Sequence, residues 1–242
     1  MSTNLKGRKN CKAVVDNAVK AMGGVDILAN NATYQMMVND INDLSVSEYV
    51  SSPASLISPF STIRYKLVNV FQASPSYNNY KSTANPPICE GQWVHTFNTN
   101  IHPYFYMAKY TLPLLSRGSA VINNASINAS INAYIGRPDL LDYTSTKGAI
   151  ISFTRDLSNQ YVGRDVRVNA VAPGPVQTPL IPAAIIDEAL KSFTAPMGRP
   201  AQPRKIAACF VFLVSIDSSA ISSQTLHPWW LMGRRRKIMS LL

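Results

Sequence analysis

The sequence predicts an α/β fold in which helices cover both faces of a parallel β-sheet. Three short runs rich in Val, Ile, Leu and Ala, at residues 25–30, 120–124 and 166–172, have the composition of buried strands. Longer segments with apolar residues at helical spacing separate and follow these runs, and this alternation is typical of a doubly wound parallel sheet. With 242 residues, of which 46% are hydrophobic, the chain is long enough for one domain with a sizeable core.

Each predicted helix has its own signals in the sequence. Residues 10–22 carry apolar side chains at helical spacing between Asn10, a typical N-cap, and Gly23, a typical stop. The remaining helices are expected at residues 93–115, 142–162 and 203–214, and a last short strand at residues 224–226. Pro103 and Pro113 interrupt the first of these helices, because proline lacks the N–H that a helix interior uses.

The chain is strongly basic. It carries 23 Lys and Arg against 13 Asp and Glu, which gives a formal net charge of +10. A balance of this kind can serve a nucleic-acid or membrane partner. Here much of the charge lies in two clusters near the ends, at residues 6–12 and 234–237. We interpret these clusters as solvated charge and expect no nucleic-acid partner.

The sequence predicts neither a membrane span nor a metal site. The longest apolar run, residues 206–214, is far shorter than the ~20 residues that a spanning helix needs. Residues 1–12 are polar and basic, without the apolar stretch of a secretory signal. Cys11, Cys89 and Cys209 have no metal-ligand spacing, and such thiols suit a reducing compartment. We therefore expect a cytoplasmic protein without membrane contact or bound metal.

The most informative segment of the chain is Tyr143-Thr-Ser-Thr-Lys147, at the start of the predicted helix 142–162. A spacing of four residues places the phenol and the ammonium group on one face of a helix. A nearby Lys⁺ favours the phenolate, so Lys147 is expected to lower the pKa of Tyr143 from its ordinary value of about 10. A tyrosine tuned in this way can exchange a proton with an alcohol or carbonyl oxygen near neutral pH.

Further motifs surround this pair in a fixed order along the chain. They are Asn30-Asn31-Ala32 after the first strand, Phe97-Asn-Thr-Asn100, Gly118-Ser-Ala-Val-Ile-Asn-Asn-Ala-Ser126, and Ala172-Pro-Gly-Pro-Val-Gln-Thr178. In this order and spacing they resemble the short-chain dehydrogenase/reductase family, over residues 10–45 and 92–228. Within the family, the run Ile135-Gly-Arg-Pro-Asp-Leu-Leu-Asp-Tyr143 resembles the glucose/ribitol-dehydrogenase-like, NADP-dependent branch.

The resemblance implies a Rossmann-like doubly wound sheet and an oxidoreductase that transfers hydride between a nicotinamide and an alcohol, sugar or carbonyl compound. By the same resemblance Tyr143 is the general acid/base, and Lys147 lowers its pKa and hydrogen-bonds the nicotinamide ribose. Asn100 holds a water that links Lys147 to solvent, and a serine holds the substrate oxygen. Members of the family form dimers or tetramers, so a homo-oligomer is the expected assembly.

Two serines compete for the position beside Tyr143. Family spacing places the serine thirteen residues before the tyrosine, at Ser130. Counting forward from the preceding predicted strand selects Ser126 instead. The ambiguity arises from a tandem repeat, in which Ala-Ser-Ile-Asn occurs at residues 125–128 and again at 129–132. We prefer Ser130, because the residues between the serine and Tyr143 form the loop that aims the two side chains at each other.

The cofactor implied by the resemblance is NADP or NAD. The residues expected to contact it follow the carboxyl ends of strands or lie in the tyrosine–lysine motif, and ligands bind at such strand ends in open α/β sheets. They are Asn30, Asn31, Ala32, Tyr143, Lys147, Pro173, Gly174, Val176 and Thr178. The three histidines, His95, His102 and His227, form no metal cluster in the sequence.

Three departures from the family pattern define the expected domain organisation. No glycine-rich G-x-G-x-x-G or G-x-x-x-G-x-G run occurs in the chain, and the family's first strands are missing. Residues 46–91, rich in Ser, Pro, Asn and Tyr, are expected to be an irregular insert. We interpret it as an unspliced intron, with a genuine disordered or lid loop as the alternative. Residues 229–242 form a basic tail outside the family pattern. We therefore predict one partial, N-terminally truncated domain over residues 1–228.

Two functions remain open from the sequence. The first is the oxidoreductase described above, acting on a small-molecule alcohol or carbonyl substrate. The second is a catalytically inactive remnant of the family, which acts at most as a dimerisation partner through the helices at 93–115 and 142–162. The strand at residues 25–30 is expected to be an unpaired apolar edge, and such an edge favours aggregation. We accordingly expect low solubility and no measurable dinucleotide affinity.

Overall fold

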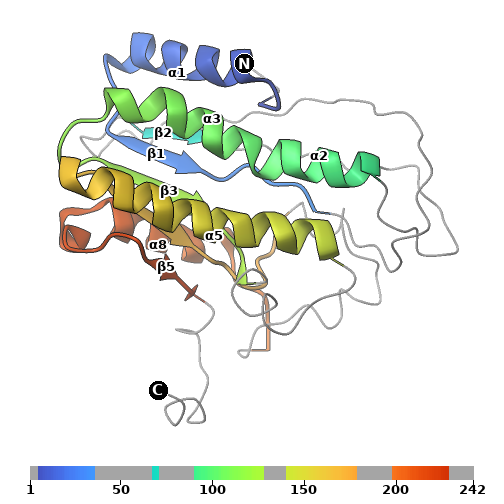
Figure 1. Cartoon of the computed structure of the whole chain (residues 1–242). Coiled ribbons are helices and arrows are strands. Elements are labelled where there is room, and N and C mark those ends of the chain that lie inside the picture. Colours follow the sequence, from blue (N-terminus) through green and yellow to red (C-terminus); the bar gives the residue numbers. More distant parts are fainter. Residues whose placement is uncertain (1–4, 36–66, 71–89, 128–139, 179–197, 229–242) are drawn as a thin grey trace, which may run out of the picture.

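Helices and strands alternate along the chain, as the sequence predicts (Figure 1). The computed structural model describes residues 5–35, 67–70, 90–127, 140–178 and 198–228. Its helices are α1 (Arg8–Met22), α2 (Glu90–Asn100), α3 (His102–Thr111), α5 (Leu141–Tyr161) and α8 (Pro203–Val214). Its strands are β1 (Ile27–Asn30), β2 (Leu67–Val70), β3 (Ala120–Asn124), β4 (Arg167–Val171) and β5 (Thr225–Leu226). Short 3₁₀ turns follow α3, α5 and α8: η1 (Leu112–Leu114), η3 (Val162–Arg164) and η4 (Ile216–Ser218).

The strands of the described residues form one sheet in the order β2-β1-β3-β4-β5. Every neighbouring pair is parallel, so the prediction of a parallel sheet is confirmed. Parallel neighbours need long crossover connections, and packed helices usually supply them. In Figure 1, α3 and α5 pass in front of the sheet, α2 continues from α3, α1 lies above α3 at the top, and α8 lies behind the strands.

Apolar side chains fill the space on both faces of the sheet. On the face covered by α1, α3 and α5, Val121 packs in one cluster with Val15 and Met107. On the opposite face its neighbour Ile122 packs in another cluster with Leu213 of α8. All of these side chains are at most 1% exposed. Successive residues of a strand point to opposite faces, which is why a strand covered on both sides has a continuous apolar sequence.

The predicted helix at residues 93–115 is divided in the structure. α2 ends at Asn100, Ile101 occupies the N-cap position of α3, and Pro103 stands in the first turn of α3. Proline fits there because the first turn of a helix does not use the N–H that proline lacks. Pro113 likewise lies in the 3₁₀ turn η1. The predicted interruption at both prolines is confirmed.

The predicted insert contributes a strand to the sheet. β2 pairs in parallel with all four residues of β1. The expectation that residues 46–91 lie outside the fold is therefore wrong for Leu67–Val70, and the expectation that β1 is an unpaired edge is wrong as well. The N–H and C=O groups of an apolar edge strand need partners, and the short run Leu67-Val-Asn-Val70 supplies them. Because β1 is paired along its whole length, the argument that its open edge would cause aggregation no longer applies.

The structure bears on the predicted absence of a membrane span, but it does not describe the predicted tail or most of the predicted insert. Within the parts of the chain that the structure describes, no helix is both long and apolar enough to cross a membrane. The predicted tail at residues 229–242 and the stretches of the insert at 36–66 and 71–89 lie outside the described residues. Cys11 and Cys209 carry free thiols.

Candidate active site

The chain reverses its winding direction between β1 and β3. β2 lies on one side of β1 in the sheet, and β3, which follows β2 in the chain, lies on the other side of β1. From β3 the strands continue away from β1 through β4 to β5. In a sheet of this strand order, ligands bind in the crevice at the carboxyl ends of the two strands that flank the reversal. The side chains of greatest interest therefore lie at and just after Asn30 and Asn124, the last residues of β1 and β3.

Asparagine side chains tie the ends of β1 and β3 together. Asn30 Nδ2 donates to Asn123 Oδ1 at 2.9 Å, and Asn123 Nδ2 donates to Thr154 Oγ1 of α5 at 3.0 Å. Asn124 Nδ2 donates to Asn31 Oδ1 at 2.5 Å. Buried amides need such partners, because a hydrogen bond left unmade away from water is costly. These pairs fix the spacing of the two strand ends and connect them to α5.

Tyr143, Lys147 and Ser126 meet at the end of β3. The tyrosine and the lysine lie one turn apart on α5, with Lys147 Nζ 5.6 Å from the centre of the Tyr143 ring. The side chains of Ser126 and Tyr143 are hydrogen-bonded to each other. All three residues are buried, with exposed fractions of 7% for Tyr143 and Ser126 and 0% for Lys147. The structure thus brings the tyrosine–lysine pair together with a serine.

The backbone carbonyl of Asn124 receives two donors from this cluster. Lys147 Nζ donates to it at 2.9 Å, and the hydroxyl of Tyr104, from α3, donates to it at 3.1 Å. Tyr104 is only 2% exposed, and burial together with neighbouring Tyr143 raises the pKa of its phenol well above the ordinary value. A peptide oxygen has two lone pairs, so this one carbonyl holds both the lysine and a second tyrosine in place.

Burial governs the ionisation of Tyr143 and Lys147. Loss of water around the phenolate raises the pKa of Tyr143 to about 12, and the hydrogen bond with Ser126 only partly offsets this rise. Burial also lowers the pKa of Lys147 to about 7, because its ammonium form loses hydration. The expected lowering of the Tyr143 pKa is therefore wrong for this structure. The reason is that burial disfavours the charged form of both partners at once.

Asn100 is fully buried and anchors the segment that follows β1. Its Oδ1 accepts a hydrogen bond from Tyr34 N at 2.6 Å, and its Nδ2 donates to Tyr34 O at 2.9 Å. The same Nδ2 donates to Thr146 Oγ1, next to Lys147 in the sequence, at 3.0 Å. The side chain therefore links α2, α5 and the chain after β1. Its expected part in a water relay to Lys147 stays a prediction.

The residues predicted to contact a cofactor fall into two groups. Asn30 and Ala32, 2% and 1% exposed, are held in the sheet and the core. Asn31 and the segment after β4 are half-buried and closer to the surface, and this segment includes Pro173, Gly174, Val176 and Thr178. Pro173 O accepts a hydrogen bond from Ile127 N at 2.9 Å, so the segment runs beside the chain that follows β3.

The structure places one of the two competing serines. Ser126 lies beside Tyr143, whereas Ser130 falls outside the described residues. Sequence reasoning missed Tyr104, because a phenol within an apolar helical pattern normally predicts core packing. It also missed Asp142, whose carboxylate accepts a hydrogen bond from the backbone N–H of Tyr143. An acidic residue in the first turn of a helix, directly before Tyr143, is a sequence signal for such a contact.

Comparisons with known proteins identify relatives of this chain. A family model described as enoyl-(acyl carrier protein) reductase matches residues 87–228, more than half of the chain. The chain is 41% identical over 221 residues to glucose and ribitol dehydrogenase of Daucus carota. It is 37% identical over 229 residues to NADPH-dependent aldehyde reductase 1, chloroplastic, of Arabidopsis thaliana. These alignments cover 90% and 93% of this chain but only 60% and 63% of the two relatives.

A solved structure shares the architecture. The crystal structure of a short chain dehydrogenase from Burkholderia cenocepacia in complex with NADP superposes with a TM-score of 0.66, over 93% of this chain and 72% of that one. The sequence identity is 18%, so this likeness concerns the fold alone, and it confirms the Rossmann-like α/β prediction. On the match of the family model and the arrangement of Tyr143, Lys147 and Ser126, the chain belongs to the short-chain dehydrogenase/reductase family.

Proposed function

We propose that this protein is an NADP- or NAD-dependent oxidoreductase that transfers hydride between a nicotinamide and an alcohol, sugar or carbonyl substrate. The observation that carries the proposal is the buried cluster of Ser126, Tyr143 and Lys147 at the carboxyl end of β3. Such a cluster supplies a proton donor and an oxygen-binding hydroxyl at the place where an open α/β sheet binds its ligand. Family membership supports the same class of reaction.

The polar groups around the cluster fit the nicotinamide–ribose part of a dinucleotide. Lys147 offers an amine, and Asn124 Oδ1 is a buried oxygen without a hydrogen-bond partner among the described residues. Both groups suit ribose hydroxyls, and a buried acceptor without a partner favours a ligand that donates to it. When bound, the nicotinamide supplies or accepts the hydride. We favour NADP, because one relative is named an NADPH-dependent reductase.

In the direction of carbonyl reduction, Tyr143 acts as the acid. Its raised pKa keeps the phenol protonated at neutral pH, so a proton is available for the substrate oxygen. Ser126, already hydrogen-bonded to Tyr143, is placed to hold that oxygen. Lys147, whose pKa is about 7, carries a proton that can replace the one that Tyr143 gives up. In the oxidation direction the same groups require the phenolate, which favours alkaline conditions.

The proposal includes a homo-oligomer and a cytoplasmic location. Large apolar side chains on α2, α3 and α5 are exposed, among them Trp93 (37%), Phe105 (48%) and Leu141 (42%). Exposed apolar surface of this kind is typical of protein–protein contacts, and a second copy of the chain is the partner that the family suggests. The free thiols of Cys11 and Cys209 suit a reducing compartment.

Replacing Tyr143 with phenylalanine tests the proposed reaction. Tyr143→Phe removes the proton donor but keeps the ring in its site, so we expect NADPH-dependent aldehyde reduction to slow by roughly 10²–10⁴-fold. Tyr110→Phe is the matched control, because the Tyr110 hydroxyl takes part in a hydrogen bond with Arg8 Nε at the surface and should leave the rate unchanged. The measurement is the consumption of NADPH, together with calorimetric titration of NADPH.

Two outcomes of that experiment would reject the oxidoreductase. One is a Tyr143→Phe variant that turns over at the original rate. The other is an unmodified protein that neither consumes nor binds NADPH. The missing glycine-rich run on its own predicts this second result, which would favour the catalytically inactive alternative.

Alanine substitutions distinguish the two serines. Ser126→Ala should lower the reduction rate by about 10²-fold, as expected for the loss of one donor to the reacting oxygen. Ser130→Ala is expected to leave the rate unchanged. The reverse pattern would assign the role to Ser130.

A further inference from the structure

A buried polar seam joins α2 to α5 directly beside Tyr143. We define it by its five side chains, which recur every four residues on both helices: Gln92, Thr96 and Asn100 on α2, and Asp142 and Thr146 on α5. None of them is more than 9% exposed. Side chains four residues apart lie on one helix face, so each helix presents a polar stripe to the other.

The contacts of the seam fix how the two helices lie against each other. Thr96 of α2 meets Asp142 of α5, and one turn later Asn100 meets Thr146. Because both sets of contacts advance in the same direction along the chain, α2 and α5 run parallel, and they lie side by side in Figure 1. A shift of either helix by one residue would break both links at once.

Asp142 is the centre of the seam. Its Oδ2 accepts hydrogen bonds from Thr96 Oγ1 at 2.6 Å and from Gln92 Nε2 at 3.1 Å. Its Oδ1 accepts one from the backbone N–H of Tyr143 at 2.7 Å. Leu140, at the N-cap position of α5, makes no side-chain cap, so Asp142 takes over the binding of a free N–H in the first turn. Bonds to a carboxylate are shorter and stronger than bonds between neutral groups.

We propose that Asp142 is a positioning residue, which holds the first turns of α5 against α2 and so fixes Tyr143 and Lys147 at the end of β3. The catalytic meaning of this role rests on the proposed function. The link is direct, since Asp142 binds the backbone of Tyr143 itself. Asn100 continues the seam to the backbone of Tyr34, so the same contacts tie the site to the chain after β1.

The titration of Lys147 tests this proposal without cofactor or turnover. The probe is the side-chain NMR signal of labelled lysine, assigned with Lys147→Met. In Asp142→Ala the first turns of α5 loosen and water reaches the amine, so the pKa of Lys147 should rise from about 7 by roughly one to two units. The described titratable groups that face Lys147 are the phenols of Tyr143 and Tyr104. Both have raised pKa values and stay neutral in this range.

The direction of the shift separates positioning from charge. If Asp142 acted on Lys147 only through its negative charge, Asp142→Ala would lower the pKa of Lys147 instead of raising it. Thr96→Val is a milder second variant, which keeps the shape of the side chain, removes one donor and should give a smaller rise. Ser158→Ala is the control on the same helix, because it loses only the hydrogen bond with Ser222 and should leave Lys147 unchanged.

An exchange of donor and acceptor provides the rescue. Gln92→Glu alone sets two carboxylates together and should disturb Lys147. Asp142→Asn alone turns an NH₂ group toward Gln92, which the Gln92 amide can meet by presenting its oxygen, so its effect on Lys147 should be smaller. In the double variant the new amide on α5 can donate to the new carboxylate on α2, while the amide oxygen still accepts from Tyr143 N. The titration of Lys147 should then return toward pH 7.

Activity is a second and separate measurement. Asp142→Ala should lower kcat by about 10–10²-fold with little change in KM, as expected for misplaced catalytic groups. An unmodified protein without turnover would reject the proposed function but leave the titration result standing. A pKa of Lys147 that is unchanged or lowered in Asp142→Ala, or a double variant without rescue, would overturn the positioning role.

Discussion

Lys147→Met is expected to stabilise the protein near neutral pH and, in the same variant, to abolish turnover. Lys147 is fully buried, and burial lowers the pKa of its ammonium group from 10.5 to about 7. A shift of this size corresponds to a penalty on the order of 3–5 kcal/mol for keeping the group charged in the folded protein. Methionine carries no charge, and the Asn124 carbonyl that loses Lys147 keeps its hydrogen bond from Tyr104.

The gain in stability depends on pH in a direction that the pKa shift fixes. Below about pH 7 the lysine is protonated in both the folded and the unfolded chain, so the full penalty is present. Between about pH 7 and 10.5 the unfolded chain binds a proton that the folded chain does not, and the stability of the unmodified protein rises with pH. The advantage of Lys147→Met is therefore largest below about pH 7 and disappears toward pH 10.5.

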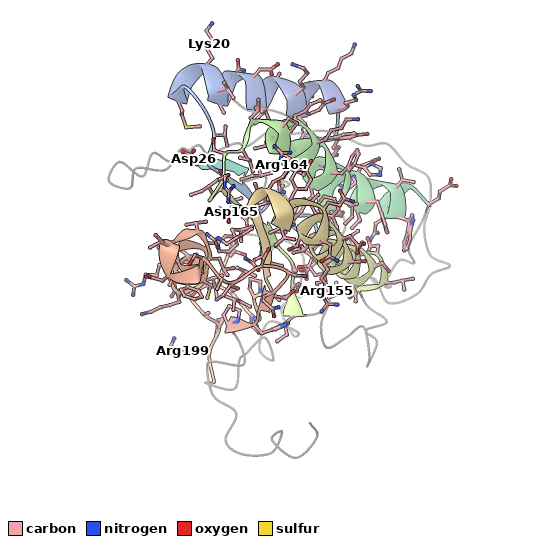
Figure 2. All side chains as sticks on the ribbon, turned by 60° about the vertical axis from the view of Figure 1, so that its left-hand side comes forward. Lys20, Asp26, Arg155, Arg164, Asp165 and Arg199 are labelled. Atoms are coloured by element: carbon pink, nitrogen blue, oxygen red, sulfur yellow. The ribbon has the colours of Figure 1, made fainter. Side chains whose placement is uncertain are left out.

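Urea unfolding of both proteins across this pH range measures the difference in free energy of unfolding. Lys20→Met is the matched control, because Lys20 points from α1 away from the rest of the protein (Figure 2) and is exposed. It should change the free energy of unfolding by less than about 0.5 kcal/mol at any pH. A difference for Lys147→Met that does not vary with pH would show that burial of the charge is not its cause.

Arg167→Met is expected to destabilise the protein by about 3–5 kcal/mol, as for other buried charged groups that lose their hydrogen bonds. Arg167, on β4, is 7% exposed and donates to the chain that ends α8. Its Nη1 binds Leu213 O at 2.6 Å and Ser218 O at 3.1 Å, and its Nη2 binds Ser215 O at 3.3 Å. The last carbonyls of a helix have no partner within it and favour a positive charge.

An exposed arginine provides the control for this prediction. Arg117 pairs with Asp165 at 3.7 Å, but its side chain is 85% exposed, and surface pairs of this kind contribute about 0–1 kcal/mol. Arg167→Lys keeps the charge but loses the planar set of donors, so its loss of stability should be intermediate. The midpoint of urea unfolding measures the stability of Arg167→Met, Arg167→Lys and the control Arg117→Met. Similar midpoints for Arg117→Met and Arg167→Met would contradict the anchoring role of Arg167.

The buried strands and the long helices could be predicted because their signals are local. The ranges 120–124 and 203–214 were predicted with the bounds that β3 and α8 have in the structure. The division between α2 and α3 followed from Pro103 alone. β2 could not be predicted, because it is a four-residue strand in a polar segment far from its partner β1. A short strand is stabilised by the neighbour it pairs with rather than by its own pattern.

The tyrosine–lysine pair could be predicted, but its ionisation could not. A spacing of four residues fixes which side chains share a helix face, and this requires no knowledge of the rest of the fold. The pKa of each group depends on how much water the surrounding elements exclude, and that depends on side chains such as Tyr104 from distant segments. The serine was ambiguous for a related reason, since two identical repeats have the same local sequence and only their placement differs.

Because Tyr104 and Lys147 share the peptide oxygen of Asn124, the lysine amine can change partners without leaving that oxygen bare. If Lys147 turns toward a bound nucleotide, the tyrosine hydroxyl still occupies one lone pair of the carbonyl. The tip of β3 then has no need to shift, and the exchange involves a single hydrogen bond. The hydrogen bond from Tyr104 would thus hold the Asn124 carbonyl in place while the amine of Lys147 changes its partner.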